Sequence, residues 1–550
     1  MIKPLLLRVP PITAHSDESL AEYIAEEMGI PKSEITGIRR IRQSIDARSR
    51  EVMIQVQVEV FINEPFQQFK IQNSKFKNVS AANPVIIVGS GPAGIFAAFK
   101  LIEFGLKPII LERGKEVSER RRDIAALTKQ RIVNPESNYC FGEGGAGTFS
   151  DGKLYTRSTK RGDIERILHL FVAHGAEERI LYEAHPHIGT NKLPKITTAM
   201  RKTITEHGGE FHFNSKVSEL IVENNICKGV KLSSGETVNA KAVLLATGHS
   251  ARDIFFMLHR QNILIEAKPF ALGVRIEHPQ QLIDSIQYKC TLRGEYLPPA
   301  SYSLVHQSQG KGVFSFCMCP GGIIAPAMTN PGEIVVNGWS PSRRNNPYAN
   351  SGMVVSVEAH PLPLPLGGEK SPTPTLPIRE GDSNTSPPQW GGFKRGLDEA
   401  LSLLHFQQAV EQRAFVVGGG NLQAPAQRVT DFIAGKTSST LPGNSYFIGT
   451  TSVNLRDVLP PDISRSLREG LIAFGKKMKG YVTEEGIMVA TESRTSSPVR
   501  IPRDKETLQH PQVKGLYPCG EGAGYAGGIV SAAMDGERCA DMIGSACLKP

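Results

Sequence analysis

The alternation of apolar and polar positions near the start of the chain predicts a small structural unit. Residues 5–9 and 35–45 predict strands, and residues 51–62 are apolar at alternate positions, which is typical of a half-buried strand. Residues 16–28 predict a helix, because serine and aspartate stand at its start and a glycine follows its end. We therefore predict a β-α-β-β module of the ferredoxin-like type over residues 1–80.

From residue 84 onward, apolar runs alternate with helical periods and glycine-rich turns, which is typical of an α/β protein. The pattern stops at residues 360–392, which have no apolar periodicity and hold eight prolines between Pro361 and Pro388. Such a stretch cannot form a regular helix or fill a core, so we predict a disordered insertion there. The polar residues 73–83 are the predicted linker between the first unit and the rest.

A strand-turn-helix pattern at the start of the α/β region predicts a dinucleotide-binding fold. The apolar run 85–88 leads directly into the sequence GSGPAG, a G-x-G-x-x-G motif that opens an apolar helix. Gly89 allows a tight turn, Gly91 lets the backbone approach a pyrophosphate, and Gly94 lets the helix pack on the strand. Glu112 ends the next predicted strand, where its carboxylate can accept hydrogen bonds from ribose hydroxyls.

Further segments favour FAD over a nicotinamide cofactor. Glu-Arg-Gly at 112–114 resembles the flavoprotein version of the fold, and residues 243–248 (VLLATG) form a strand that ends in the Ala-Thr-Gly recurrent in flavoproteins. Residues 515–522 (GLYPCGEG) resemble the second FAD motif, in which the acid holds the ribityl or pyrophosphate region. Glycines 527–528 open an apolar helix whose N–H groups would face the pyrimidine edge of the flavin.

These motifs and the loop at 141–153 (FGEGGAGTFSDGK) resemble a bacterial family of FAD-dependent dehydrogenases that is related to the fumarate-reductase and glutathione-reductase flavoproteins. The resemblance covers nearly the whole chain except residues 360–392, and it implies FAD as the cofactor. It implies an α/β fold class with a Rossmann-like FAD-binding domain, an interleaved α+β substrate domain and the small N-terminal ferredoxin-like domain. The predicted boundaries are 84–155 with 241–250 and 490–546 for the FAD-binding domain, and 156–240 with 251–489 for the substrate domain.

The predicted FAD-binding residues lie in these motifs, in the glycine-rich loop and at Val217. They are Gly89, Gly91, Pro92, Ala93, Gly94, Glu112, Arg113, Gly144, Gly145, Gly147, Thr148, Gly152, Lys153, Val217, Thr247, Gly248, Gly520, Glu521, Gly527, Gly528 and Ile529. We predict no metal site, and the sequence singles out no catalytic acid or base. The candidates for substrate contact lie at 142–153, 316–322 and 343–345.

Two glycine-rich segments have competing interpretations. Residues 147–153 match G-x-x-x-x-G-K, but Leu154 stands where a nucleotide-binding P-loop needs Ser or Thr, so we favour a loop that passes close to the flavin. Residues 416–421 resemble a second dinucleotide turn, but Gln423 replaces its third glycine and Pro425 would interrupt its helix. The chain therefore lacks a clear nicotinamide domain.

Two further signals concern cysteine and histidine. Cys317 and Cys319 could form a redox pair, but a Cys-x-Cys disulfide is strained, so we favour buried apolar thiols. His249 follows the Ala-Thr-Gly segment and could lie near the flavin, although a structural role is the favoured interpretation. Neither signal identifies a reaction.

Composition and charge narrow the range of partners. The net charge of +9 is spread over 550 residues, and acids interrupt or flank the basic clusters, which disfavours a nucleic-acid partner. No apolar run reaches the about 18 residues that a membrane span needs. Eight cysteines without framework spacing predict a reducing, cytoplasmic setting. The 53 glycines indicate many close backbone approaches, or a disordered stretch.

The predicted function is that of an FAD-dependent oxidoreductase. A hydride would pass between flavin N5 and an unidentified small-molecule substrate, with NAD(P)H as a candidate transient donor. Two alternatives stay open. One is a flavoprotein that binds or modifies RNA through its N-terminal domain, and its candidate contacts are Arg39, Arg40, Arg42, Arg48 and Arg50. The other is an interaction scaffold in which FAD is mainly structural.

Overall fold

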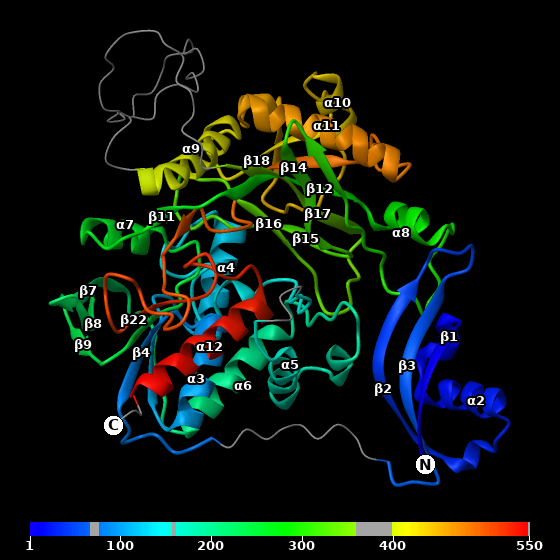
Figure 1. Ribbon diagram of the computed structural model, residues 1–550. Helices are drawn as coiled ribbons and strands as arrows, with labels where there is room; N and C mark the ends of the chain where they lie inside the picture. Colours follow the sequence, from blue (N-terminus) through cyan, green and yellow to red (C-terminus); the bar gives the residue numbers. More distant parts are fainter. Residues whose placement is uncertain (67–75, 157–160, 359–398, 548–550) are drawn as a thin grey trace.

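The computed structural model describes residues 1–66, 76–156, 161–358 and 399–547 (Figure 1). The predicted disordered insertion at 360–392 lies outside these residues, as does the start of the predicted linker. Within them, the chain forms a small N-terminal sheet, a parallel sheet covered on both faces, and a larger mixed sheet.

The N-terminal unit contains the four elements that the sequence predicts. Strands β1 (Ile2–Val9), β3 (Met53–Ile62) and β2 (Ile35–Asp46) pair antiparallel in the order β1-β3-β2, and the short helix α1 (Pro11–His15) precedes α2 (Asp17–Met28). The Ser16 hydroxyl caps α2 by accepting a hydrogen bond from the Ser19 N–H at 3.1 Å. A complete ferredoxin-like fold continues after its third strand with another helix and a fourth strand. Residues 63–66 form neither, so that classification stays a prediction.

A five-stranded parallel sheet forms the centre of the second unit. Its strands, in pairing order, are β22 (Leu516–Pro518), β10 (Val243–Leu245), β4 (Pro84–Val88), β5 (Lys107–Leu111) and β6 (Glu210–His212). From β4 the chain adds β5 and β6 on one side and later β10 and β22 on the other, so the order reverses between β4 and β10. Open α/β sheets bind their ligands beyond the carboxyl ends of the strands at such a reversal.

Apolar residues cover both faces of this sheet, which explains the uninterrupted apolar run in β4. Val85 and Ile87 face α3 (Pro92–Phe104) and α12 (Ile529–Cys547), whereas Ile86 and Val88 face the antiparallel strands after β6 and helix α7. Helix α12 lies directly beside α3 (Figure 1), so close that a Cβ on Gly536 would be 2.1 Å from the Ala93 carbonyl oxygen. The other elements of this unit are α4 (Val117–Gln130), α5 (Ile164–Ala173), α6 (Leu193–Glu206), β7 (Val217–Glu223), β8 (Ile226–Leu232), β9 (Thr237–Asn239) and α7 (Arg252–Arg260).

A seven-stranded mixed sheet forms the third unit. Its order is β13 (Val305–Ser308), β14 (Lys311–Cys319), β17 (Tyr348–Val357), β12 (Phe270–Pro279), β20 (Ile487–Glu492), β18 (Ala424–Arg428) and β19 (Thr450–Ser452). Helices α9 (Ser402–Val417), α10 (Val429–Ala434) and α11 (Pro461–Lys477) cover its outer side, and the β15 (Ile323–Pro326) and β16 (Val336–Trp339) hairpin lies on the opposite side (Figure 1). Helix α8 (Gln280–Tyr288) and the two-stranded pair β11 (Glu266–Ala267) and β21 (Val499–Arg500) complete the regular elements.

The structure differs from the predicted boundaries in two places. Residues 156–240 were assigned to the substrate domain, yet β6 pairs with β5, and α6 packs against α3 in the parallel-sheet unit. Residues 490–492 were assigned to the FAD-binding domain, yet they end β20 of the seven-stranded sheet. Short strands that join a distant sheet edge have no local signature, because their pairing partners are far away in the sequence.

The helices exclude one alternative interpretation of the sequence. Val416 and Val417 form the last turn of α9 rather than a strand, which confirms that residues 416–421 are not a second dinucleotide turn. Among the residues that the structure describes, no helix combines the length and the apolar character needed to cross a bilayer.

Candidate functional site

A cavity of about 690 Å³ opens at the carboxyl ends of β4 and β10, where the strand order reverses. Cofactor and ligand pockets typically have volumes of about 300–1,000 Å³. The predicted residues that line this cavity are Gly89, Gly91, Pro92, Ala93, Glu112, Arg113, Gly145, Gly147, Gly152, Lys153, Val217, Thr247, Gly248, Gly520, Glu521, Gly527, Gly528 and Ile529. Gly94, Gly144 and Thr148 lie outside its lining. The fold therefore brings motifs from four distant parts of the chain to one place.

The glycines of the first turn fall into two groups. Gly89 has φ +105°, and a Cβ there would be 2.6 Å from the Ala246 carbonyl oxygen. A Cβ on Gly94 would be 2.1 Å from the Gly89 carbonyl oxygen. These two glycines are required by the packing of the turn itself.

Other glycines of the cavity border open space. A Cβ built on Gly91, Gly248 or Gly527 meets no protein atom within 4 Å, and all three residues line the cavity. Helix α3 begins beside Gly91 without a side-chain cap, so the N–H groups of its first turn have no side-chain acceptor. An anionic phosphate group fits such a helix start. The residues present therefore fit a dinucleotide such as FAD.

Glu112 holds the first turn against the glycine-rich loop. Its Oε2 accepts hydrogen bonds from the Ser90 N–H at 3.0 Å and the Ser90 hydroxyl at 2.8 Å. Its Oε1 accepts from the N–H groups of Gly114 at 2.9 Å and Gly142 at 3.0 Å. These donors engage both carboxylate oxygens, so the predicted ribose contact needs the Ser90 hydroxyl to turn away. That contact stays a prediction.

Arg120 is a residue of this site that the sequence did not single out. It is fully buried in α4 and donates hydrogen bonds to the carbonyls of Asn138, Tyr139, Glu143 and Gly145 at 2.8–2.9 Å. Burial lowers the pKa of its guanidinium to about 10. One side chain thus fixes the loop that forms a wall of the cavity. In the sequence it is one member of a basic triplet, without any signal of its own.

We expect Arg120→Met to loosen this loop and lower the affinity for FAD at least tenfold, because four buried carbonyls lose their donors. Arg121 is exposed on the same helix, so Arg121→Met is the matched control. Flavin content after gel filtration and limited proteolysis around residues 138–147 measure the effect. Equal flavin content in both variants would contradict this role.

His249 and Glu521 face each other on the cavity wall. The Nδ1 of His249 lies 3.2 Å from Glu521 Oε2, and its Nε2 lies 2.9 Å from the Arg494 carbonyl oxygen. The imidazole therefore bridges the end of β10 to the segments after β20 and β22. Because His249 also lines the cavity, its structural role and its role beside the flavin both stay predictions.

The cavity wall opposite the glycine turns is formed by the seven-stranded sheet and by the β15–β16 hairpin. Phe316 and Cys317 of β14 and Trp339 of β16 line it, facing Lys153 of the glycine-rich loop. Of the predicted substrate contacts, residues 343–345 do not line the cavity. Arg344 instead pairs with the buried Asp151 at 3.2 Å.

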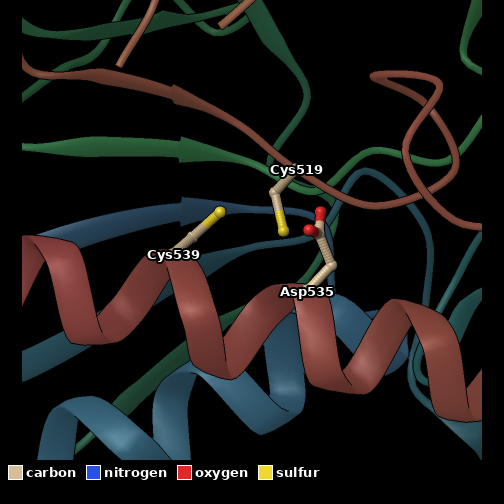
Figure 2. A group of neighbouring side chains, drawn as sticks. All are labelled: Cys519, Asp535 and Cys539. Carbon is tan, nitrogen blue, oxygen red and sulfur yellow. The ribbon is translucent and has the colours of Figure 1, made fainter. Parts of the chain in front are cut away.

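Three side chains behind the cavity have the composition of a metal site (Figure 2): Cys519, Asp535 and Cys539. The guanidinium of Arg503 lies beside two of these side chains, Asp535 and Cys539. It lies 2.6 Å and 3.0 Å from the two Asp535 oxygens and 3.3 Å from Cys539 Sγ. The Gly520 N–H also donates to Asp535 at 2.8 Å. A cation is therefore already present, and the group fixes the Gly520 turn to α12.

Comparison with known families and relatives gives consistent results. The family described as "FAD-dependent protein, C-terminal domain-like" matches residues 269–370 and 389–495, and "FAD dependent oxidoreductase" matches residues 184–297. A domain of unknown function (DUF8436) matches residues 1–61. A Clostridium beijerinckii protein named only "Uncharacterized protein" is 37% identical over 98% of both chains. A 4,4'-diapophytoene desaturase of a Methylomonas species is 43% identical over 53 residues, 10% of each chain.

Solved structures with similarity to the chain include flavoproteins. CtdE in complex with FAD is 11% identical over 84% of each chain with a TM-score of 0.28. Glycine oxidase from Bacillus cereus is 13% identical over 85% of this chain and 96% of that one, with a TM-score of 0.29. These scores are too low to carry a conclusion about activity. The family matches and the full-length relative show the family: the chain belongs to the FAD-dependent oxidoreductases.

Proposed function

We propose that the protein is an FAD-dependent dehydrogenase of a small molecule. The observation that carries the proposal is one cavity that joins the backbone-lined turns of the parallel sheet to a side-chain wall from the seven-stranded sheet. FAD bound there would supply a two-electron acceptor for a hydride from a substrate carbon or from NAD(P)H. The eight free cysteines fit a reducing, cytoplasmic setting.

The residues of the parallel-sheet unit would bind and orient the cofactor. Gly91 and the first turn of α3 would hold the pyrophosphate, because backbone N–H groups and an open face meet there. The start of α12 at 527–529 lines the same cavity, and its N–H groups would stabilise the negative charge of the reduced ring. Thr247 and Glu521 border the region between these two ends.

The residues of the seven-stranded sheet would hold the substrate. Phe316 of β14 and Trp339 of the β15–β16 hairpin offer apolar faces that exclude water. Asn337 of the same hairpin offers an amide, and Lys153 of the facing glycine-rich loop offers an ammonium group. A small molecule with an apolar body and one polar or anionic group fits this set. Because Val416 and Val417 end α9 and do not form a strand, NAD(P)H would have to dock in this cavity rather than on a second dinucleotide fold.

The RNA-binding alternative gains no support from the N-terminal unit. Arg39 pairs with Glu59 at 2.5 Å, Arg40 with Asp17 at 2.8 Å, and Arg48 with Asp46 at 2.8 Å. Arginines engaged in this way are less available to phosphates. We therefore favour the dehydrogenase.

Anaerobic stopped-flow reduction of the holoenzyme tests the proposal, with NADH, NADPH and a panel of small metabolites as donors. We expect at least one donor to bleach the oxidised flavin within seconds, and Trp339→Ala to slow that reduction at least tenfold while retaining FAD. The exposed Phe447, which does not line the cavity, provides the control Phe447→Ala. A flavin that dithionite reduces but that no donor reduces would contradict the proposal.

A further inference from the structure

Strand β14 reaches the cavity wall in a bulge that carries two cysteines. Phe316 pairs with Gly352 and Cys319 with Asn350, so β14 has one residue more than its partner β17 between these pairs. Cys317 lies inside the bulge with φ +46°, a left-handed conformation that non-glycine residues rarely adopt. Met318 packs into the apolar core. The two cysteines therefore do not lie on a regular strand.

The two thiols differ in access. Cys317 is partly exposed and lines the cavity, whereas Cys319 is fully buried behind it. An accessible thiol with a buried neighbour is the arrangement of an attacking and a resolving cysteine.

Two cations contact this pair. Lys153 Nζ lies 3.5 Å from the Sγ atoms of both cysteines. Arg275 Nη2 lies 3.3 Å from Cys319 Sγ and 2.7 Å from the Cys317 carbonyl oxygen. The surroundings of the two sulfurs are therefore cationic, which differs from the apolar setting that the sequence analysis favoured.

The charges around the pair leave room for one thiolate. Lys153 and Arg344 lie 3.6 Å and 3.2 Å from the buried Asp151, and Arg275 lies 3.1 Å from Glu492. Glu277 also interacts with Arg275, and Glu183 with Arg344. Burial raises the pKa of Glu277 and of Glu492 to about 7, which weakens the compensation of Arg275 by carboxylates. Cations that are incompletely compensated can stabilise a thiolate.

The pKa values of the two thiols are shifted in opposite directions. A hydrogen bond from the Cys319 thiol, together with the charges of Lys153 and Arg275, holds the pKa of Cys317 well below its ordinary value despite burial. Burial and that same hydrogen bond raise the pKa of Cys319. Of the two thiols, Cys317 is therefore the one that ionises more readily.

We propose that Cys317 and Cys319 form a redox-active dithiol that exchanges two electrons with FAD, a role that rests on the proposed flavin site. In the oxidising direction an S–S bond forms between the two sulfurs while the S–H bond of Cys319 breaks. The electron pair and that proton pass to FAD, which becomes the anionic reduced flavin, so charge and hydrogen both balance. Lys153 keeps its proton and stabilises the Cys317 thiolate when the disulfide is reduced again.

Reductive titration of the holoenzyme with dithionite tests this couple. We expect air-oxidised wild type to take up twice the reducing equivalents per FAD of either Cys317→Ser or Cys319→Ser. Cys290 lies outside the cavity lining, so Cys290→Ser should titrate like wild type. Mass spectrometry of the alkylated oxidised protein should find a 317–319 disulfide that is absent after reduction.

A second readout concerns the thiol itself. At neutral pH, iodoacetamide should label Cys317 in the reduced holoenzyme at least tenfold faster than Cys290, and Lys153→Met should remove most of that difference. Equal reducing equivalents in wild type and both serine variants, without a disulfide, would overturn this inference and leave the proposed function intact. A flavin that no donor reduces would overturn the proposed function, while a 317–319 disulfide that dithionite reduces would still support the dithiol.

Discussion

Replacing Gly91 by valine should abolish FAD binding while the fold stays intact. The backbone at Gly91 has φ −71°, which any residue can adopt, and a Cβ there meets no protein atom within 4 Å. The new side chain would instead project into the cavity where the pyrophosphate is expected. Gly91 also precedes the first residue of α3, so valine there costs about 1 kcal/mol of helix capping. We expect flavin content to fall at least tenfold, measured by absorbance after gel filtration.

Gly294 offers a matched control for that substitution. It too has space for a Cβ and no left-handed backbone, but it does not line the cavity. Gly294→Val should therefore keep full flavin content. If Gly91→Val retained FAD, or if it melted far below the flavin-free wild type, the assignment of this turn to the cofactor would be wrong.

Removing the carboxylate of Glu411 should cause the largest loss of stability. Glu411 is buried on α9 between Arg252 of α7 and Arg494, which follows β20. Its Oε2 lies 2.6 Å from Arg252 Nη2 and 2.9 Å from Arg494 Nη2. Glu333 completes the group, at 3.0 Å from Arg252 and 3.1 Å from Arg494. Two buried cations thus balance two buried carboxylates, and Arg494 also lines the cavity.

We expect Glu411→Ala to lower the free energy of unfolding by about 3–5 kcal/mol, because it leaves a buried positive charge without a partner. Glu411→Gln keeps acceptor and shape but not charge, so its loss should be smaller. Gln412→Ala, at the neighbouring exposed position, is the control and should change stability by less than about 0.5 kcal/mol. Urea unfolding followed by circular dichroism measures all three. A near-neutral Glu411→Ala would contradict the role of this group in joining the two sheets.

Motifs with a strong local signature were predictable. The run at 85–88 became β4, the GSGPAG segment became the turn into α3, and the helix after 527–528 became α12. In each of these segments, neighbouring residues supply the turn, the cap and the apolar pattern, so the local sequence is enough to predict the element. Glu112 was placed correctly at the end of β5, but the donors around its carboxylate come from loops that the sequence could not position.

Residues whose role depends on distant partners were not predictable. Arg120 is one arginine among three in a row until the fold brings four carbonyls around it. Cys317 and Cys319 suggest inert thiols until β14 bulges toward Lys153, which is more than 160 residues earlier in the chain. Strand β6 was assigned to the wrong unit because three residues carry too little pattern to reveal a partner strand.

The sequence by itself determined the family, the cofactor and the α/β fold class. A dinucleotide is bound mainly by the protein backbone, and short glycine motifs indicate where the backbone must approach the ligand closely. Tertiary structure alone decided which glycines leave open space and which are required by packing, how four buried charges join two sheets, and which side chains face the substrate region. Those properties arise from distances between residues far apart in the chain. The order of the strands in the sheets sets these distances, so they cannot be read from the spacing of residues along the sequence.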